Sequence, residues 1–160
     1  MTRLRALKTR LAAERWALLP LRLLLGFGFA AHGWAKLARG PGSFATILDA
    51  IGVPAATLMA WLTSLVELLG GLALMAGLSV AALSVPLGAI MATALVTVHL
   101  RYGFSSIRLK AVTAAGAEFG PVGFELNLLY VAGLLALALG GTSPLSVDRW
   151  LEGRREERKG

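Results

Sequence analysis

Residues Leu21 to Leu37, LRLLLGFGFAAHGWAKL, form the stretch of sequence that decides the fold. The run is apolar enough to predict part of a membrane-spanning helix, yet it contains Arg22, His32 and Lys36. A charged side chain in hydrocarbon is costly, so these groups should face protein, a cavity or water. On a helix Arg22 and Lys36 share one stripe, and His32 lies beside it.

The composition predicts a membrane protein with a single domain. Hydrophobic residues make up 56% of the 160 residues and the mean hydropathy is +0.70, whereas only 16% of the residues are charged. The net charge of +7 does not indicate nucleic-acid binding, because the basic residues lie mostly outside the apolar runs and form no nucleic-acid motif.

The chain has no cysteine, which excludes disulfides, thiolate nucleophiles and cysteine-ligated clusters within it. Its two histidines, His32 and His99, lie on different predicted spans without the spacing of a metal motif. We therefore predict no metal site and no covalently bound cofactor, and we assign no catalytic residue.

Four apolar runs reach the length of about 20 residues that is needed to cross a bilayer, and they predict an all-α, antiparallel transmembrane four-helix bundle. Their approximate bounds are 16–37, 55–78, 80–100 and 122–140. The connection after the first run predicts a short amphipathic surface helix over 43–52. The longer connection, 101–121, is expected to be a plain surface loop, with a cover over a pocket as the alternative.

Basic residues near the span ends predict that both termini are cytoplasmic. Residues 1–15 and the tail 141–160 hold five Lys or Arg each, against five near the span ends on the opposite side: Lys36, Arg39, Arg101, Arg108 and Lys110. The basic start followed by an apolar run also fits a signal peptide, but Arg22 interrupts the run and no clean cleavage site precedes His32. We therefore expect an uncleaved first span and a multi-pass protein of the cell (inner) membrane.

Two layers of polar residues are expected inside the bundle. Arg22 and Glu67 lie deep, and each shares a helix stripe with small residues that mark close helix packing. They predict a buried ion pair, with proton exchange between Glu67 and a ligand as the alternative.

The outer layer is the candidate ligand site. Its members are His32, Lys36, His99 and Glu125, which with Glu67 form the candidate ligand-binding and proton-handling set. Interfacial groups that reach toward the lipid headgroups are the alternative for these residues. Asn127 lies on the side of its helix away from Glu125 and is expected to bond to a loop.

Four segments in order resemble the DoxX family of small four-helix membrane proteins. They are RLLLGFGFAAHGWAKL, VELLGGLALMAGL, HLRYGF and GFELNLLYVAGLLALALGGTSPLSVD, within residues 18–150. The matching positions are Arg22, Gly26, Gly33, Lys36, Glu67, Gly70, Gly71, His99, Gly103, Glu125, Ser146 and Asp148. Relatives of the wider superfamily use cysteine pairs, which this chain lacks, so the resemblance does not imply direct thiol oxidation.

The resemblance implies a membrane subunit linked to redox chemistry. The family is named after subunits associated with a thiosulfate:quinone oxidoreductase, and other members are linked with oxidative stress. One hypothesis is therefore a subunit that binds a quinone or a similar lipophilic ligand inside the bundle, with a soluble or membrane redox partner protein supplying electrons. A second is a non-catalytic scaffold with structural buried charges, and a less favoured third is a small-anion carrier. Association into a homo-oligomer stays open, because small-residue faces also suit contacts between chains.

Overall fold

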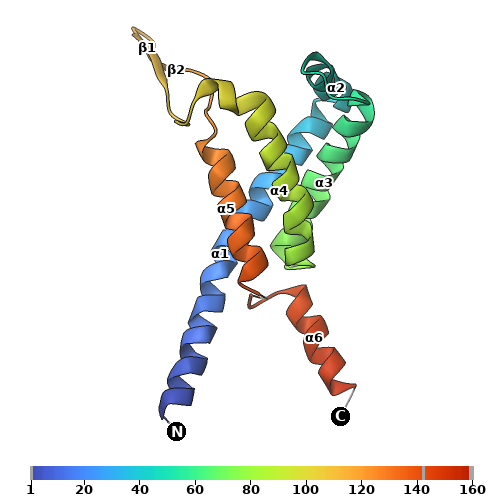
Figure 1. The fold of residues 1–160 in the computed structure, drawn as a ribbon, viewed down its shortest axis with the longest axis vertical. Helices are drawn as coiled ribbons and strands as arrows, with labels where there is room; N and C mark the ends of the chain where they lie inside the picture. Colours follow the sequence, from blue (N-terminus) through green and yellow to red (C-terminus); the bar gives the residue numbers. More distant parts are fainter. Residues whose placement is uncertain (1, 142, 159–160) are drawn as a thin grey trace.

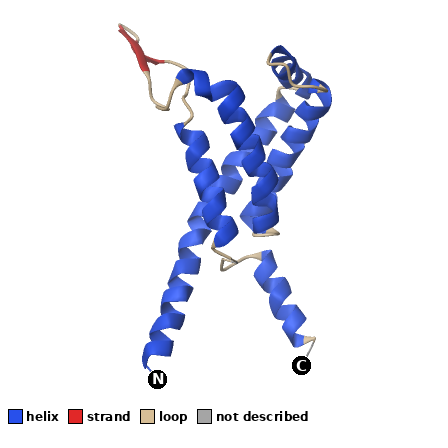
Figure 2. Ribbon diagram, viewed as in Figure 1, coloured by secondary structure: helices blue, strands red, loops and turns tan. Residues whose placement is uncertain are grey.

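The computed structural model describes residues 2–141 and 143–158, and most of them are helical (Figures 1 and 2). Residues 1, 142, 159 and 160 of the predicted terminal segments lie outside the described part. The elements in chain order are α1 (Thr2–Ala38), α2 (Pro41–Ala50), α3 (Ala56–Ala76), α4 (Val80–Ala94), the π-helical turn η1 (Leu95–His99), the 3-10 turn η2 (Leu100–Tyr102), β1 (Leu109–Thr113), β2 (Gly116–Phe119), α5 (Glu125–Leu139) and α6 (Val147–Glu157).

Within the described residues, three helical segments are long and apolar enough to cross a membrane: Trp16–Ala38, Ala56–Ala76 and Val80–Tyr102. The fourth predicted run forms α5, an apolar helix of 15 residues. At 1.5 Å per residue such a helix covers about 22 Å, less than the roughly 30 Å of a hydrocarbon core. The prediction of membrane helices is thus confirmed for three spans, and the fourth helix is shorter than expected.

Glycines bring α1 and α3 into close antiparallel contact. A Cβ atom on Gly71 would lie 2.5 Å from the backbone nitrogen of Ala30 and 2.6 Å from the carbonyl oxygen of Gly26. Further along, a Cβ atom on Gly33 would lie 2.7 Å from the carbonyl oxygen of Ser64. Only glycine allows backbones to approach this closely. In a membrane the hydrophobic effect does not drive helices together, so close packing of this kind is what holds them to one another.

The buried apolar core lies where α1, α3, α4 and α5 meet. It consists of Leu25, Phe29, Leu74, Val80, Leu87, Leu134 and Leu137. The Phe29 ring meets the Tyr130 ring edge to face, with centroids 5.2 Å apart. Apolar side chains also cover the outside of these helices, as at Phe27, Leu69, Val85 and Leu135, which is the surface expected against lipid.

The two ends of the helix cluster differ. Both chain termini extend from one end, which we call the terminal end and which includes α6 and the turn between α3 and α4 (Figure 1). The opposite end, the hairpin end, carries α2 and the β1–β2 hairpin (Figures 1 and 2).

The short helix predicted between the first two spans is present as α2, which packs against α3. The prediction that 101–121 is a plain loop is wrong, since β1 and β2 pair there as an antiparallel hairpin. The chain is therefore not purely α-helical. Alanines such as Ala111 and Ala117 made the strands hard to recognise in the sequence, because alanine is less common in strands than β-branched and aromatic residues.

Candidate functional site

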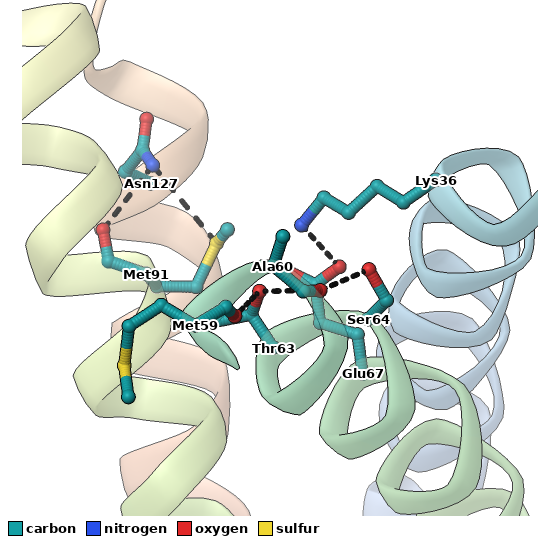
Figure 3. A network of polar contacts seen from close by, with 8 residues as sticks. All are labelled: Lys36, Met59, Ala60, Thr63, Ser64, Glu67, Met91 and Asn127. Carbon is teal, nitrogen blue, oxygen red and sulfur yellow. Dashed lines mark hydrogen bonds and ion pairs between the residues drawn. The ribbon is translucent and has the colours of Figure 1, made fainter. Parts of the chain in front are cut away.

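An ion pair between α1 and α3 is the polar contact best placed to act as a site. Lys36 Nζ donates to Glu67 Oε2 over 2.5 Å, and Figure 3 shows Lys36 reaching from α1 across to the α3 residue. The Glu67 side chain is only 5% exposed, whereas that of Lys36 is 22% exposed. The carboxylate is therefore enclosed, whereas the Lys36 side chain is partly exposed.

The surface helix α2 covers the ammonium group with an aromatic ring. Lys36 Nζ lies 4.5 Å from the centroid of the Phe44 ring, at a distance typical of a cation–π contact. The Lys36 charge is thus held by a carboxylate from α3 and a ring from α2. Movement of α2 would change how far this charge is exposed.

Nearby hydroxyls on α3 do not share the Glu67 carboxylate. Ser64 Oγ donates to the Ala60 carbonyl oxygen over 2.6 Å, and Thr63 Oγ1 donates to the Met59 carbonyl oxygen over 2.6 Å (Figure 3). Both hydroxyls are therefore used within their own helix. In the part of the chain that the structure describes, Lys36 supplies the hydrogen bond that the buried carboxylate receives.

The predicted ion pair between Arg22 and Glu67 is wrong. Arg22 Nη1 donates to Ser143 Oγ over 2.5 Å and Nη2 donates to the Leu145 carbonyl oxygen over 3.0 Å. The antiparallel register explains the error, because Arg22 lies opposite Gly77 at the end of α3. Glu67 lies about 15 Å back along the same helix, where Lys36 faces it instead.

Arg22 belongs to a set of contacts at the terminal end that we call the C-terminal clasp: Arg22, Gly77, Ser143, Leu145 and Asp148. The Asp148 carboxylate accepts the backbone N–H groups of Ser79 and Val80 at the start of α4, and the Asp148 N–H donates to the Gly77 carbonyl oxygen. A carboxylate at this place satisfies free backbone donors and suits the helix dipole. The clasp fastens the segment before α6 to α1 and to the α3–α4 turn.

His99 and Glu125 fasten the connection at the hairpin end. His99 Nδ1 donates to the Val122 carbonyl oxygen over 2.9 Å, since a carbonyl can only accept. Glu125 Oε2 accepts the backbone N–H of Ser106 over 3.0 Å. Both residues thus bind backbone groups of the segments that flank the hairpin.

The predicted outer cluster is therefore not assembled. Among the described residues, no hydrogen bond or ion pair joins His32, His99 or Glu125 to the Lys36–Glu67 pair. His32 lies on an exposed part of α1. Of the five residues in the candidate set, the structure brings together Lys36 and Glu67.

Asn127 lies inside the protein, so the prediction that it bonds to a loop is wrong. The residue is 4% exposed, and its Nδ2 donates to the Met91 carbonyl oxygen of α4 over 3.3 Å (Figure 3). Glu125 occupies the first turn of α5 and faces the connection, so the opposite side of α5 is the one that packs. The helical periodicity correctly put Glu125 and Asn127 on different sides of α5. The side predicted to face the interior was the wrong one.

An open groove of about 770 Å³ lies between α2 and the start of α3. Its lining includes Ala45, Thr46, Asp49 and Thr57. The described residues contain no group of three or more His, Asp or Glu side chains that could hold a metal ion.

Comparisons with known proteins place the chain among membrane proteins. The family model DoxX matches residues 17–100, just over half of the chain. A protein of Mycobacterium tuberculosis, described as an uncharacterized membrane protein, is 32% identical over 145 residues, covering 84% of this chain and 80% of its own length. No solved structure is significantly similar.

Proposed function

Because the chain belongs to the DoxX family, we propose that it is a membrane subunit that binds a quinone, or a similar lipophilic ligand, beside Lys36 and Glu67. The observation that carries this proposal is the ion pair itself, with an enclosed carboxylate and a partly exposed lysine between apolar helices. Ionisable residues inside membrane segments are costly and commonly mark ligand or proton paths. A partner oxidoreductase would exchange electrons with the ligand.

The residues at the pair suit a quinone headgroup. Quinone carbonyl oxygens accept hydrogen bonds, and the ammonium group of Lys36 is a donor with three protons, of which Glu67 accepts one. Glu67 could take up a proton when the ligand releases one, within hydrogen-bond reach of Lys36. The Phe44 ring would provide an apolar wall for a flat ring.

Ligand extraction and thermal stability test this proposal. The full chain is purified in mild detergent, bound small molecules are identified by absorbance and mass spectrometry, and a short-chain quinone is then added. We expect the quinone to raise the unfolding temperature of the unmodified chain and of the control Glu118→Gln, which removes an exposed carboxylate of the hairpin. Lys36→Met should abolish the shift. Absence of bound quinone together with no shift in the unmodified chain would contradict the proposal.

We also propose that α5 completes a four-span bundle in the inner membrane with both termini in the cytoplasm. The excess of Lys and Arg at the terminal end supports this orientation, as do the two termini leaving from one end (Figure 1). Because the chain has no cysteine, single cysteines can be placed at Glu118 and Glu157 without background. A membrane-impermeant thiol reagent added to intact cells should label position 118 and spare position 157, and the reverse pattern would overturn the orientation.

A non-catalytic scaffold is the second candidate function. Its support is that Arg22, His99 and Glu125 all bind backbone or hydroxyl groups of connecting segments, which is a structural use of charge. A scaffold would need the Lys36–Glu67 pair only for helix packing. Both hypotheses expect Lys36→Met together with Glu67→Gln to preserve assembly with a partner. A scaffold binds no quinone in either chain, whereas the ligand proposal predicts that the unmodified chain binds quinone and the doubly substituted chain does not.

A further inference from the structure

The β1–β2 hairpin has an apolar face that no described residue covers. Leu109 pairs with Phe119, and Val112 pairs with Ala117. Residues paired across an antiparallel ladder lie on the same face, and so do residues two apart on one strand. Ala117 and Phe119 are two residues apart on β2, so both pairs lie on the same face of the hairpin. We call it the apolar hairpin face, and it consists of Leu109, Val112, Ala117 and Phe119.

An irregularity in the ladder produces this face. Leu109 and Val112 are three residues apart and would point to opposite faces of a regular strand. The register shifts between Leu109 and Ala111, so that Lys110 is the extra residue. A bulge of this kind moves the alternation by one position and turns Val112 to the side of Leu109. Thr113 and Glu118 lie on the opposite, polar face.

The apolar hairpin face is open to its surroundings. Leu109, Val112 and Phe119 are 60%, 76% and 61% exposed, and Ile107 at the base of the hairpin is 76% exposed. Contiguous exposed apolar surface on a folded chain marks a contact with another surface. Figure 1 shows the hairpin projecting beyond the ends of α4 and α5, joined to them by short connections.

The neighbouring charges favour a lipid surface as the contact. The candidate span Val80–Tyr102 ends just before the hairpin, and the Arg101 guanidinium lies 4.8 Å from the centroid of the Tyr102 ring. Arg108 and Lys110 follow within the hairpin segment. Aromatic and basic residues together are typical of the membrane interface, where the cations pair with lipid phosphates.

We propose that the apolar hairpin face rests on the surface of the same bilayer that the helices span. Its side chains reach the boundary between headgroups and acyl chains, and Arg108 and Lys110 lie at the phosphates. The hairpin is then an interfacial anchor for the ends of α4 and α5. This role is independent of any ligand at Lys36 and Glu67.

Single cysteines carrying a nitroxide test the proposal, because the chain has no cysteine of its own. Val112→Cys and Thr113→Cys are neighbours on opposite faces, and Ala117→Cys with Glu118→Cys form a second matched pair on β2. Each full-length variant is placed in nanodiscs of phosphatidylglycerol and phosphatidylcholine. Collisions of the label are measured with oxygen, which concentrates in lipid, and with a water-soluble nickel chelate.

We expect the ratio of oxygen to nickel collisions to be several-fold higher at positions 112 and 117 than at 113 and 118. Equal, nickel-accessible labels on both faces would overturn the proposal by placing the whole hairpin in water. Labels at 112 and 117 that are immobile and shielded from both reagents would also overturn it, because they would indicate a contact with protein.

Discussion

Two cations on one stripe of α1, Arg22 and Lys36, show how differently a membrane helix can use a buried charge. Arg22 is 2% exposed, and its bonds go to a hydroxyl and a backbone carbonyl of the C-terminal clasp. Lys36 is partly exposed and binds one carboxylate under a ring from α2. The terminal end is closed by contacts to a hydroxyl and a backbone carbonyl, whereas the hairpin end keeps a cation whose side chain is partly exposed.

The largest expected loss of stability comes from the glycine contact between α1 and α3, which lies between Arg22 and Lys36 along α1. Gly71→Ala should destabilise the protein by about 3 kcal/mol, because the new methyl group meets backbone atoms that no side-chain rotation can move. Gly88→Ala is the matched control, since its nearest neighbour, Leu134 Cδ1, would be 3.9 Å away. Thermal unfolding in detergent measures both. Equal stability of the two variants would show that α1 and α3 do not pack as described.

At the terminal end, Arg22→Met should cost about 2 kcal/mol, because the Ser143 hydroxyl and the Leu145 carbonyl oxygen lose a buried donor. Limited proteolysis should then cut faster between α5 and α6. The control Arg155→Met changes an exposed arginine and should leave both measurements unchanged. If Arg22→Met unfolds at the same temperature as the control, the clasp does not depend on the guanidinium.

At the hairpin end, a double-mutant cycle measures the ion pair. Lys36→Met and Glu67→Gln should each destabilise, and the double variant should be milder than their sum by about 1.5 kcal/mol. Lys36→Met leaves the buried carboxylate without its hydrogen bond, and Glu67→Gln leaves the lysine without its counter-charge. The unfolding free energies of the four proteins give the coupling. Additive losses would mean that the two side chains act independently.

The smallest effect concerns the ring above the ion pair. Phe44→Leu keeps an apolar side chain but removes the cation–π contact, which should cost about 0.5 kcal/mol. The same substitution in the Lys36→Met background should cost less, because no cation lies under the ring. An equal loss in both backgrounds would assign Phe44 to ordinary packing.

The sequence predicted those features that depend on local properties. Length and hydropathy identified the three long spans, and the periodicity of Phe44, Ile47 and Leu48 predicted the surface helix that became α2. The hairpin was missed, because its alternation depends on a bulge at Lys110 that no composition rule reveals.

The partners of the buried charges could be predicted only in part. Helical periodicity showed that Arg22 and Lys36 face other helices, but the register between two helices follows from the glycine contacts along them. Glu67 was therefore paired with the wrong cation. One acceptor of Arg22 is the Leu145 backbone carbonyl. Every residue has such a carbonyl, so the sequence does not indicate which one binds Arg22.

Photoaffinity labelling of the full chain in lipid, with a photoreactive quinone, tests most directly whether the hairpin end holds the ligand. Labelled peptides are mapped by mass spectrometry, with and without excess unreactive quinone. Our account predicts labelling that the excess quinone prevents, confined to α2 and to the parts of α1 and α3 around Lys36 and Glu67, and lost in Lys36→Met. Labelling at the C-terminal clasp, or labelling that excess quinone does not reduce, would contradict it.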